Sequence, residues 1–220
     1  MQSLKRAAIT AVGHYTPPDI YDNKFFESYL ETNDAWIQAR TGIRERRYLK
    51  EGATSDMAVI AARNCLEHRG LKPEEVDCIL VATVTPDMLF PATANIIQGK
   101  LGATRAWSYD MNAACSSFLY ALNAGTRFIE TGFCKNVLVV GADKMTAIVD
   151  YDDRNTCILF GDAAGAVLLE PIEDESYGLL DFDLKTDPAG LPYLYQTAGG
   201  SLHPPTHETV DARQHFIRQE

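Results

Sequence analysis

Hydrophobic and polar positions follow two kinds of pattern over most of the chain. Continuous apolar runs at 78–84 and 136–142 are rich in β-branched residues, which is typical of strands buried on both faces. Other segments carry apolar residues at helical spacing and stop at Gly42, Gly70 or Gly102, as helices commonly do. The alternation of the two patterns predicts an α/β protein whose sheet is parallel and covered by helices on both faces.

The same pattern sets the boundaries of the elements. We expect a strand at 7–13, helices at 23–30, 34–41, 54–69 and 93–101, and two extended segments separated by glycine within 158–169. A further strand at 178–187 and a helix from 211 to 220 flank a segment rich in proline, glycine and tyrosine. A helix that stops inside its pattern after so long a loop predicts a truncated protein.

One segment joins a short strand, a turn of small residues and a helix around Cys115. Ala113 and Ala114 allow a tight turn, and Ser116 suits a helix start. Apolar residues then recur at helical spacing from 118 to 129. A cysteine in the first turn of a helix meets unpaired N–H groups and the positive end of the helix dipole. That setting favours the thiolate, so the sequence indicates a nucleophile.

The cysteine segment also has a plainer interpretation. Free cysteines are often small core residues, and apolar packing accounts for most of the pattern around Cys115. The arrangement resembles the strand–turn–helix elbow that displays a nucleophilic serine in hydrolases, but it lacks the G-x-S-x-G sequence. Both interpretations stay open from these residues alone.

Composition excludes several classes of protein. The 220 residues include 46% hydrophobic and 23% charged residues, as in ordinary globular domains. No apolar run approaches the ~20 residues of a membrane span, and the N-terminus leads straight into a strand pattern. We therefore expect a soluble, cytoplasmic protein with no membrane partner. A net charge of −10 argues against nucleic acid as a partner, because nucleic-acid binding needs a basic surface.

The cysteines and histidines predict neither disulfides nor a metal site. The five cysteines have unrelated spacings and include no C-x-x-C pair. Four of them sit in or beside apolar segments and are expected to be structural thiols: Cys65, Cys78, Cys134 and Cys157. His203 and His207 lie among prolines, where no reliable helix would bring them together, so we expect no metal.

A basic cluster interrupts the acidic sequence. Five of the 20 lysines and arginines fall between residues 40 and 50, namely Arg40, Arg44, Arg46, Arg47 and Lys50. On an acidic protein such a cluster suits a phosphate-bearing ligand or an acidic partner. Alternatively, it is a solvated turn that makes local ion pairs with Glu45 and Glu51.

Several of these stretches match a known family, in the family's order. They are T-N-D-A-W-I-Q-A-R-T-G-I-R-E-R-R (32–47), V-A-T-V-T-P-D-M-L-F-P-A-T-A (81–94), Y-D-M-N-A-A-C-S-S-F (109–118), L-V-V-G-A-D (138–143), D-D-R-N-T (152–156) and F-G-D-A-A-G-A-V-L-L (160–169). On these residues the chain resembles 3-oxoacyl-(acyl-carrier-protein) synthase III of the thiolase superfamily. The resemblance implies a thiolase-like fold with a mixed sheet covered by helices on both faces. Its N-terminal half carries the nucleophilic cysteine. Residues 1–172 would form the N-terminal half-domain, and residues 173–220 would begin a C-terminal half-domain that is truncated.

The resemblance also implies an activity, a decarboxylating Claisen condensation that starts fatty-acid synthesis. Cys115 would take an acyl group from acyl-CoA, because a thiolate both attacks and leaves a thioester readily. Malonyl-acyl carrier protein would then lose CO2 and condense with the acyl group to give 3-oxoacyl carrier protein. The Cys115 N–H is a candidate donor to the oxyanion. No cofactor is expected besides the CoA thioester, which is a substrate.

The resemblance assigns further residues to the site. Four match residues that hold CoA, with the indole on adenine and the arginines near phosphates: Thr32, Trp36, Arg40 and Arg154. Phe90 matches a residue that crosses a homodimer interface into the neighbour's acyl pocket. Each of three has an alternative. Trp36 could be a core aromatic on a helix face, and Arg154 could pair with Asp152. Phe90 could pack on its own subunit.

The resemblance stops short of two catalytic residues. In the family, a histidine and an asparagine complete the site from a second half-domain, and no histidine here replaces them by motif. Other functions therefore stay open. One is a thiolase-fold sibling, such as a hydroxymethylglutaryl-CoA synthase or a secondary-metabolite ketosynthase, which malonyl-CoA tested against malonyl-carrier protein would separate. Another is a catalytically incomplete dimerising fragment, in which Cys115 would not matter.

Overall fold

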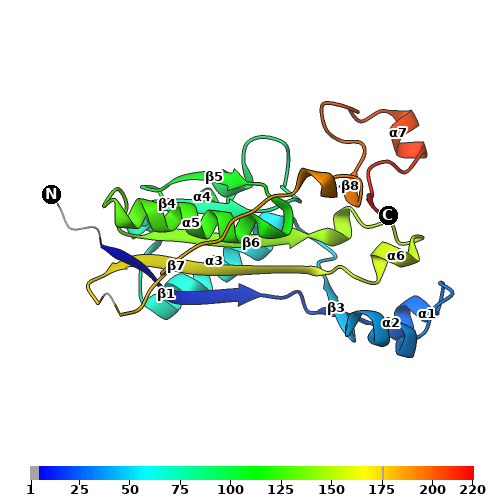
Figure 1. Cartoon of the computed structure of the whole chain (residues 1–220), viewed down its shortest axis with the longest axis horizontal. Coiled ribbons are helices and arrows are strands. Elements are labelled where there is room, and N and C mark those ends of the chain that lie inside the picture. Colours follow the sequence, from blue (N-terminus) through cyan, green and yellow to red (C-terminus); the bar gives the residue numbers. More distant parts are fainter. Residues whose placement is uncertain (1–4, 175) are drawn as a thin grey trace. The chain divides into compact units, whose positions relative to one another are not determined.

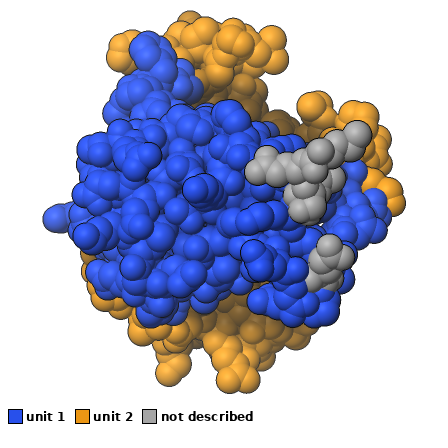
Figure 2. Space-filling model, turned by 90° about the vertical axis from the view of Figure 1, so that its left-hand side faces the viewer, with its two compact units in different colours: residues 1–17, 51–143, 163–184 blue, residues 18–50, 144–162, 185–220 orange. Residues whose placement is uncertain are grey.

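The chain folds into two compact units. The structure is a computed structural model that describes residues 5–174 and 176–220 (Figure 1). Unit 1 comprises residues 1–17, 51–143 and 163–184, and unit 2 comprises residues 18–50, 144–162 and 185–220 (Figure 2). Each unit is therefore assembled from segments that are distant in the sequence.

A mixed five-stranded sheet forms the centre of unit 1. Its strands, in spatial order, are β1 (Arg6–Tyr15), β7 (Asp162–Ile172), β6 (Val137–Lys144), β4 (Cys78–Ala82) and β5 (Trp107–Met111). β4 runs parallel to both β5 and β6, whereas β1 runs antiparallel to β7. The α/β fold with a mixed sheet is therefore confirmed, whereas the wholly parallel sheet predicted from the alternation of strands and helices is wrong, because β1 pairs antiparallel with β7.

Helices cover both faces of this sheet (Figure 1). They are α3 (Thr54–Arg69), α4 (Thr93–Leu101) and α5 (Ser117–Glu130). α3 lies so close to β1 that a Cβ atom at Gly13 would sit 2.2 Å from the Ala61 carbonyl oxygen. On the other face, a Cβ atom added to Gly125 of α5 would lie 2.9 Å from Leu169 Cδ1. Both helices need glycine at these contacts to approach the strands.

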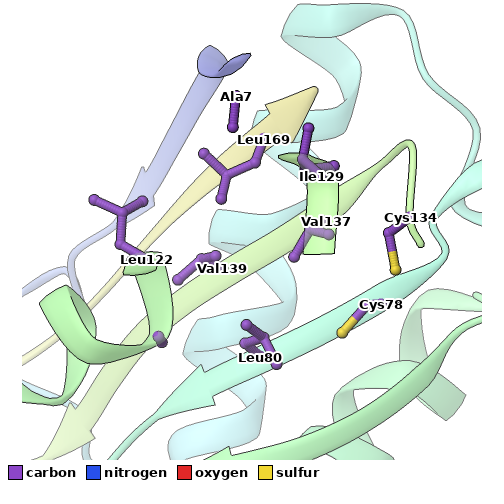
Figure 3. Packing of buried hydrophobic residues seen from close by; sticks show 10 residues of the cluster. Ala7, Cys78, Leu80, Leu122, Ile129, Cys134, Val137, Val139 and Leu169 are labelled. Atoms are coloured by element: carbon purple, nitrogen blue, oxygen red, sulfur yellow. The ribbon is translucent and has the colours of Figure 1, made fainter. Parts of the chain in front are cut away.

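The main core of unit 1 lies between α5 and the sheet. Buried side chains from the strands, from α5 and from the segment after α5 meet there, as Figure 3 shows: Ala7, Cys78, Leu80, Leu122, Ile129, Cys134, Val137, Val139 and Leu169. Successive strand residues point to opposite faces, and Ile79 and Leu138 are fully buried on the other face. The two apolar runs are therefore buried on both faces, as their composition predicts.

The parallel strands end together at one edge of the sheet. Because β5 and β6 both run parallel to β4, the segments that follow these strands start at the same edge. Residues 83–92, the Phe90 loop, connect β4 to α4, and Cys115 lies in the turn after β5. We call this edge the carboxyl edge. Ligand sites of open α/β sheets form at such edges.

Unit 2 has shorter elements around a second core. Its strands form two antiparallel pairs, β2 (Asp19–Asp22) with β3 (Glu45–Tyr48) and β8 (Leu194–Gln196) with β9 (Ile217–Gln219). Its helices are α1 (Asn23–Glu27), α2 (Asp34–Thr41), α6 (Arg154–Cys157) and α7 (His207–Asp211). Phe26, Ile37, Cys157 and Ile217 are buried in one cluster, so all three segments of the unit contribute to its core.

The helix ends of the sequence prediction are confirmed where glycine marks them. α2, α3 and α4 end at Gly42, Gly70 and Gly102, whose φ angles are 71°, 71° and 79°. A left-handed backbone favours glycine, so these ends can be recognised from the sequence. α1 ends at Glu27, before the predicted end near residue 30.

Two predicted strand arrangements are wrong. Residues 158–169 do not form two extended segments, because β7 pairs with β1 without interruption across Gly165. The described residues 178–187 contain no strand. Leu180 is 66% exposed there, so the apolar residues of that segment bury little against the fold.

One further prediction fails in unit 2, and one of the open alternatives is only partly correct. The helix expected over 211–220 is absent: Arg213 has a φ of 55°, and residues 217–219 form β9. Ile217 is buried, and its N–H donates to the Ile148 carbonyl oxygen at 2.9 Å, which favours the strand. The basic segment 40–50 is not only a turn, since it contains β3. Both β3 and β9 form because they pair with strands that are distant in the sequence.

Candidate active site

Cys115 lies at the carboxyl edge, just before a helix. A 3₁₀ turn spans Ala114–Ser116, and α5 begins at Ser117. The sequence predicted that the cysteine lies in the first turn of the α-helix. It instead precedes the helix, within the 3₁₀ turn. Cys115 is exposed, whereas the other four cysteines are buried. The interpretation of Cys115 as a core thiol is therefore wrong.

Two side chains hold this turn, residues 112–117, which we call the Cys115 elbow. Ser117 Oγ accepts a hydrogen bond from the Ala113 N–H and donates one to the Ala114 carbonyl oxygen at 2.7 Å. Asn112 Oδ1 accepts from the Ala114 N–H at 3.2 Å. Ala114 has a φ of 48°, a left-handed conformation that alanine rarely adopts. Polar residues flanking two alanines were the only sequence signal for this arrangement.

The remaining cysteines are structural, as predicted. Burial raises the pKa of the Cys65 and Cys157 thiols to about 11, and it raises the pKa of the Cys78 and Cys134 thiols as well. A thiol with a raised pKa carries little thiolate at neutral pH and is a poor nucleophile.

The Phe90 loop presents apolar side chains to solvent. Met88 is 48% exposed, and Leu89 and Phe90 are 82% and 84% exposed. Phe90 therefore does not pack on the described residues of its own chain. Phe90 and Cys115 both belong to unit 1 and both follow parallel strands that end at the carboxyl edge.

A second group of predicted residues meets in unit 2. Trp36 lies in α2, and the Arg40 guanidinium, from the next turn of the helix, sits 4.3 Å from the centroid of its indole. The Arg154 guanidinium, at the start of α6, lies 5.0 Å from the same centroid. Arg154 donates to the Glu31 carbonyl oxygen at 2.7 Å, next to Thr32. We call the four residues Thr32, Trp36, Arg40 and Arg154 the Trp36 cluster.

Details of the Trp36 cluster favour a ligand site. Thr32 Oγ1 is buried and has no hydrogen-bond partner among the described residues, which is costly unless a ligand supplies one. Arg154 does not take up the alternative pairing with Asp152, whose carboxylate instead lies 3.0 Å from Arg213. Part of Trp36 packs on the core of unit 2, so its role as a core aromatic is partly correct.

A pocket of about 370 Å³ adjoins the Trp36 cluster within unit 2. Trp36, Arg40 and Asn155 line it, and so does Glu220. An indole face with guanidinium groups suits a flat heteroaromatic ring that carries phosphate. The Glu220 carboxylate has the opposite sign and would oppose phosphate placed beside it.

The basic cluster is not one phosphate site. Arg46 is 4% exposed and donates to the Asn23 side chain and the Ile158 carbonyl oxygen. Burial lowers the pKa of this guanidinium from its ordinary value. Arg47 pairs with Glu45 at 3.2 Å, as the alternative foresaw. Lys50 pairs with Asp19 at 2.6 Å rather than with Glu51. Of the five cationic residues, Arg40 is the one that lines the pocket.

The described residues offer neither a metal site nor a membrane-spanning helix. No group of three or more histidine, cysteine, aspartate or glutamate side chains in residues 5–174 and 176–220 is placed to hold a metal ion. Within the same residues, no helix has the length and apolar character needed to cross a membrane.

Comparisons with known proteins agree on one family. The family model described as 3-oxoacyl-(acyl-carrier-protein) synthase III matches residues 109–188. The beta-ketoacyl-(acyl-carrier-protein) synthase III of Koribacter versatilis is 50% identical over 222 residues, which cover 100% of this chain and 67% of the relative. The protein of the same name from Chlorobium chlorochromatii is 54% identical over 218 residues, 98% of this chain and 66% of the relative.

A solved structure shows the same likeness in three dimensions. The crystal structure of 3-oxoacyl-(acyl carrier protein) synthase III from Pseudomonas aeruginosa PAO1 matches with a TM-score of 0.86 and 33% sequence identity. The match covers 98% of this chain and 64% of that one. The chain therefore spans about two thirds of the length of the relatives and structures it matches.

Proposed function

Because the chain belongs to the 3-oxoacyl-(acyl-carrier-protein) synthase III family, we propose that it carries the acyl-transfer centre of a condensing enzyme. The complete protein would join an acyl group from acyl-CoA to malonyl-acyl carrier protein, with loss of CO2, at the start of fatty-acid synthesis. One observation supports this most strongly. Cys115 is exposed at the carboxyl edge, while the other four cysteines are buried.

The first half-reaction is an acyl transfer. The Cys115 thiolate attacks the carbonyl carbon of the acyl-CoA thioester and forms a tetrahedral intermediate with a negative oxygen. The Cys115 N–H of the elbow is the proposed donor to that oxygen. The intermediate collapses, its carbon–sulfur bond to CoA breaks, and CoA leaves as a thiolate that takes a proton. The acyl group stays on Cys115 as a thioester.

The second half-reaction is the condensation. The carbon–carbon bond to the malonyl carboxylate breaks, CO2 leaves, and the electron pair attacks the acyl carbonyl carbon. The Cys115 thiolate is expelled, and the product is 3-oxoacyl carrier protein. By the family resemblance, a histidine and an asparagine in a second half-domain assist this step, and residues 1–172 and 173–220 divide between the two half-domains. We propose this step for the whole protein only.

The Trp36 cluster is the proposed CoA site. The Trp36 indole offers a stacking surface for adenine, and the Arg40 and Arg154 guanidinium groups suit phosphates. Thr32 Oγ1, which is buried without a partner among the described residues, is the proposed hydrogen-bonding group for the base. All four residues lie in unit 2, so this half of the site is one local arrangement.

Two further features belong to the proposal. We propose that the chain forms a homodimer in which Phe90, 84% exposed, lines the acyl pocket of its neighbour. We also propose a cytoplasmic location, which the five unpaired cysteines support, because reducing compartments keep thiols free.

Peptide-level mass spectrometry tests the acyl transfer directly. The chain is mixed with acetyl-CoA and, in parallel, with longer acyl-CoAs, and the peptide that contains Cys115 is examined for an acyl adduct. The expected adduct appears on Cys115 and is absent from the Cys115→Ala variant. If Cys115 reacts with iodoacetamide but takes no acyl group from any acyl-CoA, the proposal is wrong for this chain.

A second comparison separates the synthase from its thiolase-fold siblings. The acyl-enzyme is offered either malonyl-CoA or malonyl-acyl carrier protein, and the release of CO2 is measured with the complete protein. The proposal requires the carrier form, so turnover of malonyl-CoA alone would point to a different acceptor.

A further inference from the structure

Asp110 connects the two parts of the carboxyl edge. It is part of β5, and the strand continues through Met111 into the Cys115 elbow. Its carboxylate oxygens accept hydrogen bonds from the Thr93 N–H and the Ala94 N–H, both at 2.7 Å. Those two residues begin α4, directly after the Phe90 loop. One side chain therefore ties the strand of the nucleophile to the end of the exposed loop.

This contact supplies a cap that α4 lacks in its own sequence. The N-cap residue is Ala92, and alanine offers no side-chain oxygen to the first N–H groups of the helix. A carboxylate that accepts two backbone N–H groups at a helix N-terminus is a strong, charge-assisted partner. The chain thus relies on a residue from another strand for a task that a serine at position 92 would perform locally.

The other end of the Phe90 loop is also fixed. Asp143 Oδ1 accepts from the Val84 N–H at 2.8 Å, and Asp87 accepts from the Ser55 N–H at 2.9 Å. The Asp87 N–H donates to Thr93 Oγ1 at 3.0 Å and closes the loop on itself. The base of the loop is therefore held on both sides. Its tip, with Phe90, extends into solvent.

We propose that Asp110 is a positioning residue that fixes the Phe90 loop relative to the Cys115 elbow and thereby selects the acyl chain that reaches Cys115. The inference rests on the proposed function, because it needs Phe90 to line an acyl pocket. Every copy of the chain carries the same tie between loop and sheet. A shift of the loop would therefore alter the acyl pocket that Phe90 lines, whether that pocket belongs to the same chain or to a partner chain.

Asp110→Asn is the informative change. It keeps the shape of the side chain but replaces one acceptor oxygen with an NH2 group, which cannot accept from a backbone N–H. Asp77→Asn is the matched control. Asp77 also accepts from two backbone N–H groups, those of Lys135 and Asn136 at 2.7 and 3.0 Å, but it precedes β4 at the opposite edge of the sheet.

The readout is chain-length selectivity. The rates of Cys115 acylation by acetyl-CoA and by octanoyl-CoA are measured for the full chain, and their ratio is compared among variants. We expect Asp110→Asn to change this ratio about tenfold, because small displacements at a reacting centre have large effects on rate. Asp77→Asn should leave the ratio unchanged even where it lowers the melting temperature equally. An unchanged ratio in Asp110→Asn would overturn the proposal.

A double variant separates positioning from simple capping. Ala92→Ser added to Asp110→Asn supplies a local cap for α4 without restoring the tie to β5. Ala92 already occupies the N-cap position and has a non-helical backbone, with φ −57° and ψ 145°. If Asp110 only stabilises the helix, both the melting temperature and the selectivity return to wild type. The proposal requires the melting temperature to recover while the selectivity stays altered.

Amide hydrogen exchange keeps the inference testable if no acylation occurs. Failure of the wild-type chain to take up an acyl group would count against the proposed function alone. In that case, exchange at residues 84–94 still decides whether Asp110 holds the loop. Faster exchange there in Asp110→Asn plus Ala92→Ser than in Asp77→Asn supports the tie, and equal exchange in the two rules it out.

Discussion

The Cys115 elbow of unit 1 and the Trp36 cluster of unit 2 are built in different ways. The elbow stands between β5 and the 14-residue helix α5, and α5 packs on a buried core. The Trp36 cluster stands on α2, which has eight residues, and on α6, which has four. Its geometry depends on side chains that lie over one another, with two guanidinium groups near one indole.

The difference suggests a division of labour. A nucleophile must be held in a fixed direction, and the strand and helix that flank the elbow provide that through the backbone. A ligand site gains affinity from stacking and charge, which side chains on short elements can supply. We therefore expect changes in the elbow to alter the rate of acyl transfer, and changes in the Trp36 cluster to alter the affinity for acyl-CoA.

The largest effect is expected from removing the nucleophile. Cys115→Ala should lower acylation about 10³-fold or more, because no second group can form the thioester. Its affinity for CoA, measured by calorimetry, should be unchanged. Cys65→Ala, at a buried thiol of the same unit, should lower stability and keep the acylation rate. A Cys115→Ala protein that still forms a covalent acyl adduct would contradict the assignment.

Trp36→Ala tests the other half of the comparison. Loss of a stacking surface for a nucleobase should raise KM for acyl-CoA about tenfold and leave the maximal rate of acylation unchanged. The chain's other tryptophan provides the control, since Trp107 lies in β5 of unit 1 and is 38% exposed. Trp107→Ala should leave KM unchanged. If Trp36→Ala lowers the maximal rate instead, the two regions do not divide the work as proposed.

The sequence predicted features whose causes are local. The ends of α2, α3 and α4 could be predicted because a left-handed backbone favours glycine. The strands β4 and β6 could be predicted because strands buried on both faces must be apolar throughout. The strand, turn and helix around Cys115 were recognisable because their signals are also local, although the exact start of α5 was not predicted.

Features that depend on distant partners could not be predicted. Arg46 appears as one of several arginines in the sequence, but its guanidinium is buried against the Ile158 carbonyl oxygen, 112 positions away. The short strands β3 and β9 are fixed by their pairing rather than by their composition. Asp110 left no pattern either, because a side chain that caps a helix from another strand has no fixed spacing from it.

Thr32→Val gives a smaller effect that sharpens the comparison. Because Thr32 Oγ1 has no partner among the described residues, removing it should leave stability unchanged or raise it by up to about 1 kcal/mol. KM for acyl-CoA should nevertheless rise severalfold. In the control Thr126→Val, the lost hydroxyl donates to the Leu122 carbonyl oxygen at 2.8 Å, so stability should fall by about 1 kcal/mol with KM unchanged. A destabilised Thr32→Val protein with normal KM would make Thr32 structural.

The smallest effect concerns the response of unit 2 to acid. Asp150 is 3% exposed, and hydrogen bonds from Arg213 hold the pKa of its carboxyl below the ordinary value of 3.8. A carboxyl with a lowered pKa in the folded state stabilises the fold at pH values above 3.8, and this contribution is lost as the pH falls below that value. This ion pair ties the loop before α6 to the segment after α7.

The expected result is a difference between wild type and Asp150→Asn that depends on pH. The free energy of unfolding of the variant should be lower at pH 7, and the gap should shrink as the pH falls below 3.8. Asp152→Asn, which removes the 78% exposed partner of Arg213, should have a smaller effect because water screens that pair. In the wild type, the protection of amides at residues 207–220, taken relative to the intrinsic exchange rate at each pH, should fall at lower pH before protection of the unit 1 sheet does. Simultaneous loss of protection in both units would show that the acid response is global, so that the Trp36 cluster is no more labile than the Cys115 elbow.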